Sequence, residues 1–148
     1  MSWLVTGGAG YIGAHVVRAL VDARIDPVVI DDLSSGLESF VPSDVPFVRA
    51  SILDRDAVLG ALRDHGVTGV IHCAGYKYAG ESVKHPLHTY EQNVDGTRVL
   101  LSAMAEAEVT GLVFSSSAGV YGTPSTAVVD EQTGTFPESP YGESKLIG

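Results

Sequence analysis

The fold is decided by the stretch Val5-Thr6-Gly7-Gly8-Ala9-Gly10-Tyr11-Ile12-Gly13, which follows an apolar run and precedes a helical pattern. Glycines at Gly7, Gly10 and Gly13 let the backbone turn tightly, approach a phosphate and pack a helix against a strand. The helix that follows presents amide donors and the positive end of its dipole to an anion. The stretch therefore indicates a dinucleotide-binding loop, although its glycines are spaced GxxGxxG rather than GxGxxG.

Outward from this loop, short apolar runs alternate with helical patterns. Strands are expected at residues 3–6, 27–30, 46–49, 69–73 and 112–115, and helices at residues 11–23, 54–63, 86–105 and from 140 onward. Short, continuous apolar strands are typical of parallel sheets that are buried on both faces. The pattern predicts an α/β fold with a doubly wound parallel sheet of about five strands, in one domain over residues 1–148.

The apolar spacing also predicts which side of each helix faces the core. The expected positions are Ile12, Val16, Ala19, Leu20 and Ala23 in the first helix, Val58, Leu59 and Leu62 in the second, and Leu87, Tyr90, Val94, Leu101 and Met104 in the third. The stretch 123–140 is rich in Pro, Thr, Ser and Gly and is expected to be a loop. It ends in Ser139 as the cap and Pro140 as the first residue of the last helix.

Composition argues against several kinds of function. Nine basic and eighteen acidic residues give a net charge of −9, which opposes binding to a nucleic-acid backbone. The single cysteine, Cys73, cannot form an internal disulfide, and no stretch has the character of a signal peptide or a membrane span. We therefore expect a cytoplasmic protein without nucleic-acid or membrane partners.

Asp31 lies eighteen residues after Gly13, at the end of the second expected strand. A carboxylate at this place in a dinucleotide-binding fold accepts hydrogen bonds from ribose hydroxyls and repels a 2′-phosphate. Asp31 therefore favours NAD over NADP as the cofactor. A purely structural turn is the alternative, and the combination of glycines, helix and carboxylate argues against it.

Tyr141 and Lys145 lie four residues apart in the last helix, so their side chains share one face. The positive charge of Lys145 would favour the ionised form of the Tyr141 phenol, which could then take a proton from a hydroxyl. The segment Ser115–Ser117 ends the fifth expected strand, where ligands of open α/β sheets bind. The alternative is that Tyr141 and Lys145 belong to a plain exposed helix face.

No metal site is expected, because the histidines do not pair with cysteine or carboxylates at metal-ligand spacing. The acidic pairs Asp31-Asp32 and Asp130-Glu131 are interpreted as a ribose contact and a solvated loop, rather than as glycosidase carboxylates.

Six collinear stretches resemble the extended short-chain dehydrogenase/reductase family, and within it the UDP-glucose 4-epimerases. They read VTGGAGYIGAH (5–15), DDLSSG (31–36), VIHCAGYKYAGES (70–82), NVDGT (93–97), FSSSAGVYG (114–122) and SPYGESK (139–145). Together they span almost the whole chain. The part from Lys77 to Ser82 points to the epimerases rather than to related enzymes.

The resemblance implies that Tyr141 is the catalytic base, that Lys145 assists it and contacts the nicotinamide ribose, and that Ser117 binds the sugar hydroxyl. It also implies an NAD site that includes Tyr141 and Lys145 and is otherwise lined by Gly7, Gly10, Tyr11, Ile12, Gly13, Asp31, Asp32, Leu33, Ser35, Ser51, Ile52, Cys73, Ala74, Gly75, Lys77, Asn93 and Ser115. Ser51 stands where the family usually has an aspartate that reaches the adenine amine.

The implied reaction is the NAD-dependent 4-epimerisation of a UDP-hexose, UDP-glucose or UDP-galactose, through a 4-keto intermediate. Related 4,6-dehydratases carry an Asp-Glu pair where this chain has Ala118 and Gly119, so dehydration is not expected. The family's C-terminal half holds the uridine-diphosphate pocket and has no counterpart here, so we expect weak activity from the chain alone. The family's dimer uses the helices around Asn93 and Tyr141, which makes a homodimer a further expectation.

Two other functions stay open. The chain could be a non-catalytic NAD-binding module, or it could act as a 4-epimerase or 4-ketoreductase on another nucleotide sugar.

Overall fold

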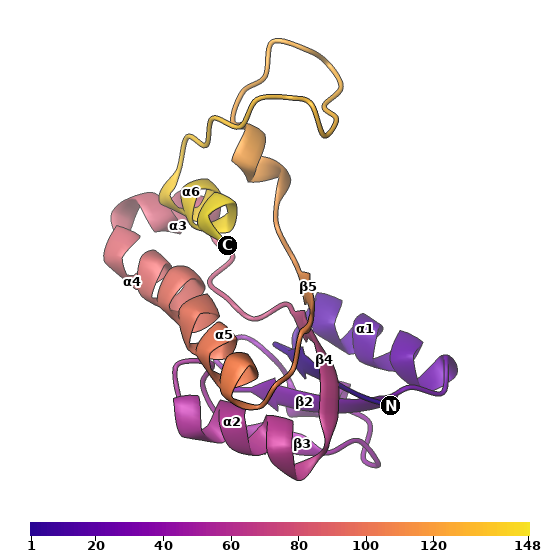
Figure 1. Cartoon of the computed structure of the whole chain (residues 1–148). Coiled ribbons are helices and arrows are strands. Elements are labelled where there is room, and N and C mark those ends of the chain that lie inside the picture. Colours follow the sequence, from indigo (N-terminus) through magenta and orange to yellow (C-terminus); the bar gives the residue numbers. More distant parts are fainter. The chain divides into compact units, whose positions relative to one another are not determined.

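The computed structural model describes residues 1–148 and shows a single five-stranded parallel sheet (Figure 1). The strands are β1 (Ser2–Thr6), β2 (Asp26–Asp31), β3 (Phe47–Arg49), β4 (Val67–His72) and β5 (Gly111–Phe114). They pair in the order β3-β2-β1-β4-β5, and every pair is parallel. The predicted α/β fold with a doubly wound, five-stranded sheet is confirmed.

The helices are α1 (Tyr11–Asp22), α2 (Arg55–Asp64), α3 (Ala79–Lys84), α4 (Pro86–Tyr90), α5 (Gly96–Glu106) and α6 (Pro140–Ile147). Three short helical turns accompany them: η1 (Glu38–Phe40), the π-helical η2 (Glu91–Asp95) and η3 (Ala118–Tyr121). The sequence did not indicate η1, α3 or η3, because each is too short to show a helical period. None of the helices is long and apolar enough to cross a bilayer.

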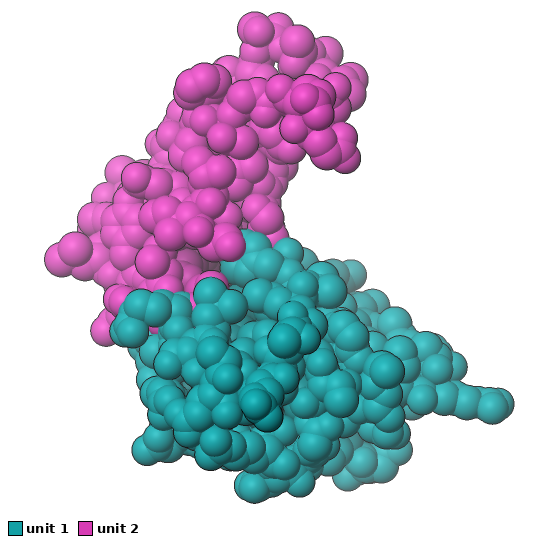
Figure 2. All heavy atoms as spheres, viewed as in Figure 1, with its two compact units in different colours: residues 1–74, 98–115 teal, residues 75–97, 116–148 magenta.

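The chain divides into two compact units (Figure 2). Unit 1 comprises residues 1–74 and 98–115 and contains all five strands, with α1, α2 and most of α5. Unit 2 comprises residues 75–97 and 116–148 and contains α3, α4 and α6. The glycine loop therefore belongs to unit 1, whereas Tyr141 and Lys145 belong to unit 2.

The core of unit 1 lies on both faces of the sheet, with α1 on one side and α2 and α5 on the other (Figure 1). The larger cluster joins sheet residues to α2 and α5 through Leu4, Ile30, Val70, Val58, Leu62, Leu100 and Met104. The smaller cluster joins Val5 and Val29 to Val17 of α1. Each such burial contributes about 1.5–3 kcal/mol of transfer free energy, so these clusters are the main source of stability in unit 1.

The predicted inward side of α2 is confirmed, but that of α1 is wrong for three of its five residues. In α1 the buried residues are Gly13, Ala14 and Val17, whereas Ile12 is 61% exposed and Ala19 and Ala23 are also exposed. Val16 and Leu20 are partly buried. The small residues face inward because the start of α1 packs directly against the glycine loop, where larger side chains have no room.

The predicted stripe along residues 86–105 is also wrong. Leu87 is 82% exposed and Leu101 is exposed, while Thr89, Asn93 and Leu100 are buried and Met104 is buried as expected. The π-helical η2 inserts one extra residue into a turn, which rotates the following residues by about 100° relative to a regular helix. A single stripe therefore cannot stay on one side across this turn.

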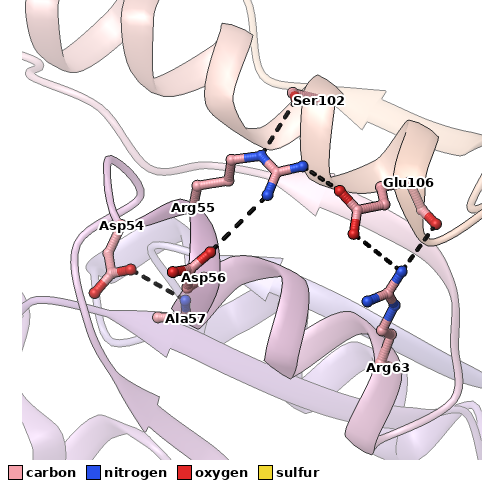
Figure 3. A network of polar contacts seen from close by, with 7 residues as sticks. All are labelled: Asp54, Arg55, Asp56, Ala57, Arg63, Ser102 and Glu106. Atoms are coloured by element: carbon pink, nitrogen blue, oxygen red, sulfur yellow. Dashed lines mark hydrogen bonds and ion pairs between the residues drawn. The ribbon is translucent and has the colours of Figure 1, made fainter.

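Polar contacts join α2 to α5 on the surface of unit 1 (Figure 3). The Arg55 guanidinium binds one carboxylate oxygen of Glu106, and Arg63 binds the other at 3.1 Å. Arg63 also donates to the Glu106 backbone carbonyl at 3.3 Å. The hydrogen bond from Arg55, helped by the positive charges of both arginines, holds the pKa of Glu106 below its usual value of 4.5.

The interior of unit 2 is polar. Its buried side chains include Ser82, Thr89, Asn93, Thr97, Ser144 and Lys145, and of the buried hydrophobic residues only Val120 belongs to this unit. Unit 2 therefore depends on hydrogen bonds much more than on apolar burial.

Candidate functional site

The glycine loop joins β1 to α1 beside the end of β4. Gly7 has a φ of +69°, in the left-handed region that favours glycine. A Cβ on Gly7 would lie 2.8 Å from the Ala74 backbone nitrogen, and one on Gly13 would lie 2.1 Å from the Gly7 carbonyl oxygen. The glycines thus allow the tight turn and the close helix packing of a dinucleotide-binding loop.

The N-terminus of α1 is open to an anion. Its cap residue is Gly10, so no side chain accepts a hydrogen bond from the amides of the first turn. Tyr11 and Ile12, the first two residues of the helix, are exposed. Unsatisfied amides and the positive end of the helix dipole at an accessible turn suit a phosphate group.

Asp31 is buried at the end of β2, and its carboxylate orders two loops. Oδ2 accepts a hydrogen bond from the Ala9 amide at 3.0 Å, and Oδ1 accepts one from the Leu33 amide at 2.8 Å. The second bond helps to hold Leu33 at its left-handed φ of +61°. Because each carboxylate oxygen has a second lone pair, Asp31 could also accept hydrogen bonds from ribose hydroxyls. Asp32 beside it is exposed and accepts from the Ser34 amide at 2.8 Å.

The other predicted cofactor residues of unit 1 lie after the strands, at the edge where open α/β sheets bind ligands. Ser35 follows β2, Ser51 and Ile52 follow β3, Cys73 and Ala74 follow β4, and Ser115 follows β5. Ile52 packs into the core, and the Ser51 hydroxyl accepts from the Leu53 amide at 3.2 Å. Strand order reverses between β1 and β4, so the strand ends of unit 1 form a topological switch point.

In unit 2, two serines satisfy the first amides of α6, the helix that carries Tyr141. The Ser139 hydroxyl accepts from the Gly142 amide at 3.1 Å, and the Ser82 hydroxyl of α3 accepts from the Tyr141 amide, also at 3.1 Å. Ser82 in turn donates to the Ala79 carbonyl at 2.6 Å. Pro140 has no amide hydrogen to satisfy. The start of α6 is therefore fixed by α3 as well as by its own cap.

Asn93, in η2, joins α6 to the loop after Gly75. Its Oδ1 accepts from the Tyr76 amide at 2.6 Å, and its Nδ2 donates to the Tyr76 carbonyl at 3.0 Å and to the Ser144 hydroxyl at 2.8 Å. The Ser144 hydroxyl donates to the Tyr141 carbonyl at 2.7 Å. Asn93, which the sequence assigned to the cofactor site, thus also holds the tyrosine helix in place.

The three catalytic candidates lie beside two glycines of unit 2, Ser117 and Tyr141 beside Gly119 and Lys145 beside Gly75. A Cβ on Gly119 would lie 3.4 Å from the Ser117 hydroxyl oxygen and 3.9 Å from Cδ1 of Tyr141, so both side chains lie next to Gly119. A Cβ on Gly75, whose φ is +143°, would lie 3.8 Å from the Lys145 ammonium. Lys145 is buried one helical turn after Tyr141, whereas Lys77 is exposed.

A further polar contact connects α4 to α6. The Tyr90 phenol donates a hydrogen bond to the Glu143 carboxylate. This bond raises the pKa of Tyr90 above its usual value of 10.0, and burial and the negative charge of Glu143 act in the same direction.

Sequence reasoning gave no role to Ser82, Ser144 or Thr6. Ser82 contacts a residue 59 positions away, and Thr6 accepts from the Ala74 amide across 68 positions, so no local pattern could reveal these contacts. No group of three or more His, Cys, Asp or Glu side chains is placed to hold a metal ion.

Known proteins place this geometry in a family. The UDP-glucose 4-epimerase of Azospirillum brasilense is 46% identical over 144 residues, which cover 97% of this chain and 41% of that enzyme. The crystal structure of the Brucella ovis UDP-glucose 4-epimerase in complex with NAD matches with a TM-score of 0.95 and 40% identity, over 99% of this chain and 45% of that one. The Streptomyces venezuelae dTDP-glucose 4,6-dehydratase DesIV matches with a TM-score of 0.91 and 31% identity, over 99% and 49% of the two chains.

The chain thus spans less than half the length of each of these relatives. The family described as "NAD dependent epimerase/dehydratase family" matches residues 3–148. With the glycine loop, the switch point and the tyrosine helix all inside the matched region, the chain belongs to the NAD-dependent epimerase/dehydratase family.

Proposed function

We propose that the chain binds NAD and carries the catalytic groups of a UDP-hexose 4-epimerase. The main support is the arrangement in unit 2, where α6 carries Tyr141 and Lys145 on successive turns and Ser117 lies beside the tyrosine at Gly119. The open N-terminus of α1 and the Asp31 carboxylate support a dinucleotide in unit 1.

The residues have distinct roles in this proposal. When bound, NAD would accept a hydride from C4 of the sugar and later return it to the same carbon. Ser117 binds the 4-hydroxyl, and Tyr141 accepts its proton in the oxidative half and gives it back in the reductive half. Lys145, which is buried one helical turn after Tyr141, assists the tyrosine and contacts the nicotinamide ribose. The 4-keto sugar rotates in the site between the oxidative and the reductive half-reaction, so that UDP-glucose and UDP-galactose interconvert.

Cofactor binding is tested first. The absorbance spectrum and mass of the purified chain should reveal bound NAD, and calorimetry should show that NADP binds at least about tenfold more weakly. Asp31→Asn keeps the side-chain shape and removes the charge, so it should reduce the difference between the affinities for NAD and NADP. Asp64→Asn, an exposed position in α2, should leave both affinities unchanged.

Turnover is tested with UDP-galactose and a coupled assay for UDP-glucose. We expect weak activity from residues 1–148 alone, because they match only 41% of the Azospirillum brasilense enzyme, and binding energy from the nucleotide handle helps to position the sugar. Tyr141→Phe should reduce any measured rate by at least about 100-fold. A rate in the wild-type chain equal to that of a full-length relative would contradict the expected weakness.

One alternative is a non-catalytic NAD-binding module. For such a module, Tyr141→Phe would leave NAD affinity nearly unchanged and no turnover would be found in either protein. The other alternative is a 4-epimerase or 4-ketoreductase that acts on another nucleotide sugar. Turnover assays with a panel of nucleotide sugars would distinguish it from a UDP-hexose 4-epimerase. The likeness to DesIV does not favour dehydration, because Ala118 and Gly119 carry no acid or base.

A homodimer also stays a prediction, and light scattering on the purified chain will check it.

A further inference from the structure

Asp31 has a basic neighbour in unit 1 that is distant in the sequence. Arg49, the last residue of β3, lies eighteen residues further along the chain. In the sheet, however, Asp31 and Arg49 are register partners, and the amide of Ala50 donates to the Asp31 carbonyl at 3.2 Å. The carboxylate proposed to bind the ribose and a guanidinium group therefore belong to adjacent strands, which lie about 4.8 Å apart.

The side chains of Asp31 and Arg49 project to the same side of the sheet. Side chains alternate along a strand, so a register pair lies on the same side as the pair two residues before it. Val29 and Phe47 form that earlier pair, and both pack into the apolar cluster beneath α1. Asp31 points the same way, since its carboxylate accepts from the Ala9 amide of the glycine loop. Arg49 thus lies beside Asp31 on the side of the sheet where α1 begins.

The Arg49 guanidinium is available to a ligand. It is exposed, and it forms neither a hydrogen bond nor an ion pair in the structure. Asp31, by contrast, accepts hydrogen bonds from two backbone amides, which offset part of its negative charge. The exposed Asp32 carboxylate accepts from the Ser34 amide. An anionic group beside Asp31 would therefore meet one unpaired positive charge as well as carboxylates that are already partly balanced.

This pairing bears on the choice between NAD and NADP, which differ by a phosphate on the 2′-oxygen of the adenosine ribose. A carboxylate at the end of the second strand binds the free 2′-hydroxyl, whereas a nearby arginine accommodates the 2′-phosphate. Arginine suits a phosphate because its planar fork of N–H donors matches the phosphate oxygens. Both kinds of group stand side by side in this chain, so Asp31 alone does not determine the preference.

We propose that Arg49 is a specificity-determining residue that binds the 2′-phosphate of NADP. Asp31 keeps NAD as the preferred cofactor, and Arg49 limits the size of that preference, so that NADP is a weaker ligand of the same site instead of being excluded from it. The inference rests on the proposed binding of NAD beside Asp31.

Calorimetry on the whole chain measures the affinities for NAD and NADP in the wild type and in Arg49→Gln. We expect Arg49→Gln to weaken NADP binding at least about tenfold, equal to 1.4 kcal/mol, and to change NAD binding less than about twofold. Arg49→Lys keeps the positive charge and should weaken NADP binding less than Arg49→Gln does. Because Arg49 is exposed, the effect on NADP should shrink in about 1 M salt.

Arg18→Gln is the matched control, because it removes the same charge from an exposed position of α1 in the same unit. It should leave both affinities unchanged. Equal weakening of NAD and NADP by Arg49→Gln would overturn the proposal, since Arg49 would then bind a part that the two cofactors share, such as the adenine ring. An unchanged NADP affinity in Arg49→Gln would overturn it as well.

A second pair of ligands separates this result from a failure of the proposed function. Adenosine 2′,5′-bisphosphate and adenosine 5′-monophosphate differ by the same 2′-phosphate and lack the nicotinamide. If the chain binds neither NAD nor NADP, the proposed cofactor binding fails, and these two ligands decide the role of Arg49. Arg49→Gln should then weaken binding of the bisphosphate at least about tenfold more than binding of the monophosphate. Equal effects on the two ligands, or no binding of either, would overturn the proposal.

Discussion

At the scale of single residues, two glycines of unit 1 should respond in opposite ways to one added methyl group. A Cβ on Gly13 would meet the Gly7 carbonyl oxygen at 2.1 Å, whereas a Cβ on Gly60, inside α2, has the Asp64 carboxylate at 3.8 Å as its nearest neighbour. Gly13→Ala should lower the free energy of unfolding by about 1–3 kcal/mol, since backbone must move. Gly60→Ala should raise it by about 0.5–1 kcal/mol. Urea unfolding followed by circular dichroism measures both, and changes of the same sign would contradict the geometry.

A second prediction concerns the hydroxyl of Ser82. Ser82→Ala removes the acceptor of the Tyr141 amide inside unit 2, where little apolar burial could compensate. We expect a loss of about 1–3 kcal/mol in the stability of α6, read from the hydrogen exchange of its amides. Ser125→Ala, in an exposed loop, is the control and should change exchange by less than about 0.5 kcal/mol. If α6 amides exchange equally in both variants, Ser82 does not hold the helix.

Residues that act through local sequence were predictable, and those that act through distant contacts were not. The glycine loop and Asp31 were found because a strand, a turn and a helix follow one another in the chain. The roles of Ser82 and Ser144 depend on partners from other elements, which only the folded chain brings together.

At the scale of elements, strands were predicted well and helix sides poorly. A strand such as β2 is buried along its whole length, so its apolar run alone identifies it. The buried side of a helix depends on the helical phase. The π-helical turn η2 changes this phase for the residues that follow it, and Leu101 after the turn is exposed. The inward side of α1 was mispredicted for another reason. The start of this helix packs closely on the glycine loop, so small residues rather than large apolar ones face the sheet there.

The contact between α2 and α5 predicts a pH dependence. Arg55 and Arg63 lower the pKa of Glu106, so the unfolded chain binds this proton more readily than the folded one. The stabilisation is present above the ordinary value of 4.5 and is lost as the pH falls through the lowered pKa. Wild type and Glu106→Gln should therefore differ in unfolding free energy at neutral pH and converge in acid. The difference should also shrink in about 1 M salt, since the groups are exposed.

Glu131→Gln controls for the loss of one negative charge at an exposed loop position. A gap between wild type and Glu106→Gln that persists in acid would show that the carboxylate does not stabilise the α2–α5 contact through its charge.

At the scale of the whole molecule, the two units are stabilised by different forces. Unit 1 holds nearly all buried hydrophobic residues, in clusters on both sides of its sheet. Unit 2 buries Asn93, Ser144 and Lys145 instead, and these are the residues that position or belong to the catalytic candidates. A polar interior is costly unless each group is paired, because the net gain per hydrogen bond is only about 1 kcal/mol. The proposed chemistry therefore lies in the unit with less apolar burial.

This difference predicts two levels of protection in native-state hydrogen exchange. Amides of β1 and β4 should exchange only through global unfolding, because Leu4 and Val70 anchor them in the core of unit 1. Amides of α4 and α6 should exchange at lower free energy, since few apolar contacts oppose the opening of unit 2. Mass spectrometry of exchanged peptides from the native chain measures both sets in one experiment. Equal protection of the two sets would mean that hydrogen bonds such as those of Asn93 stabilise unit 2 as strongly as apolar burial stabilises the sheet.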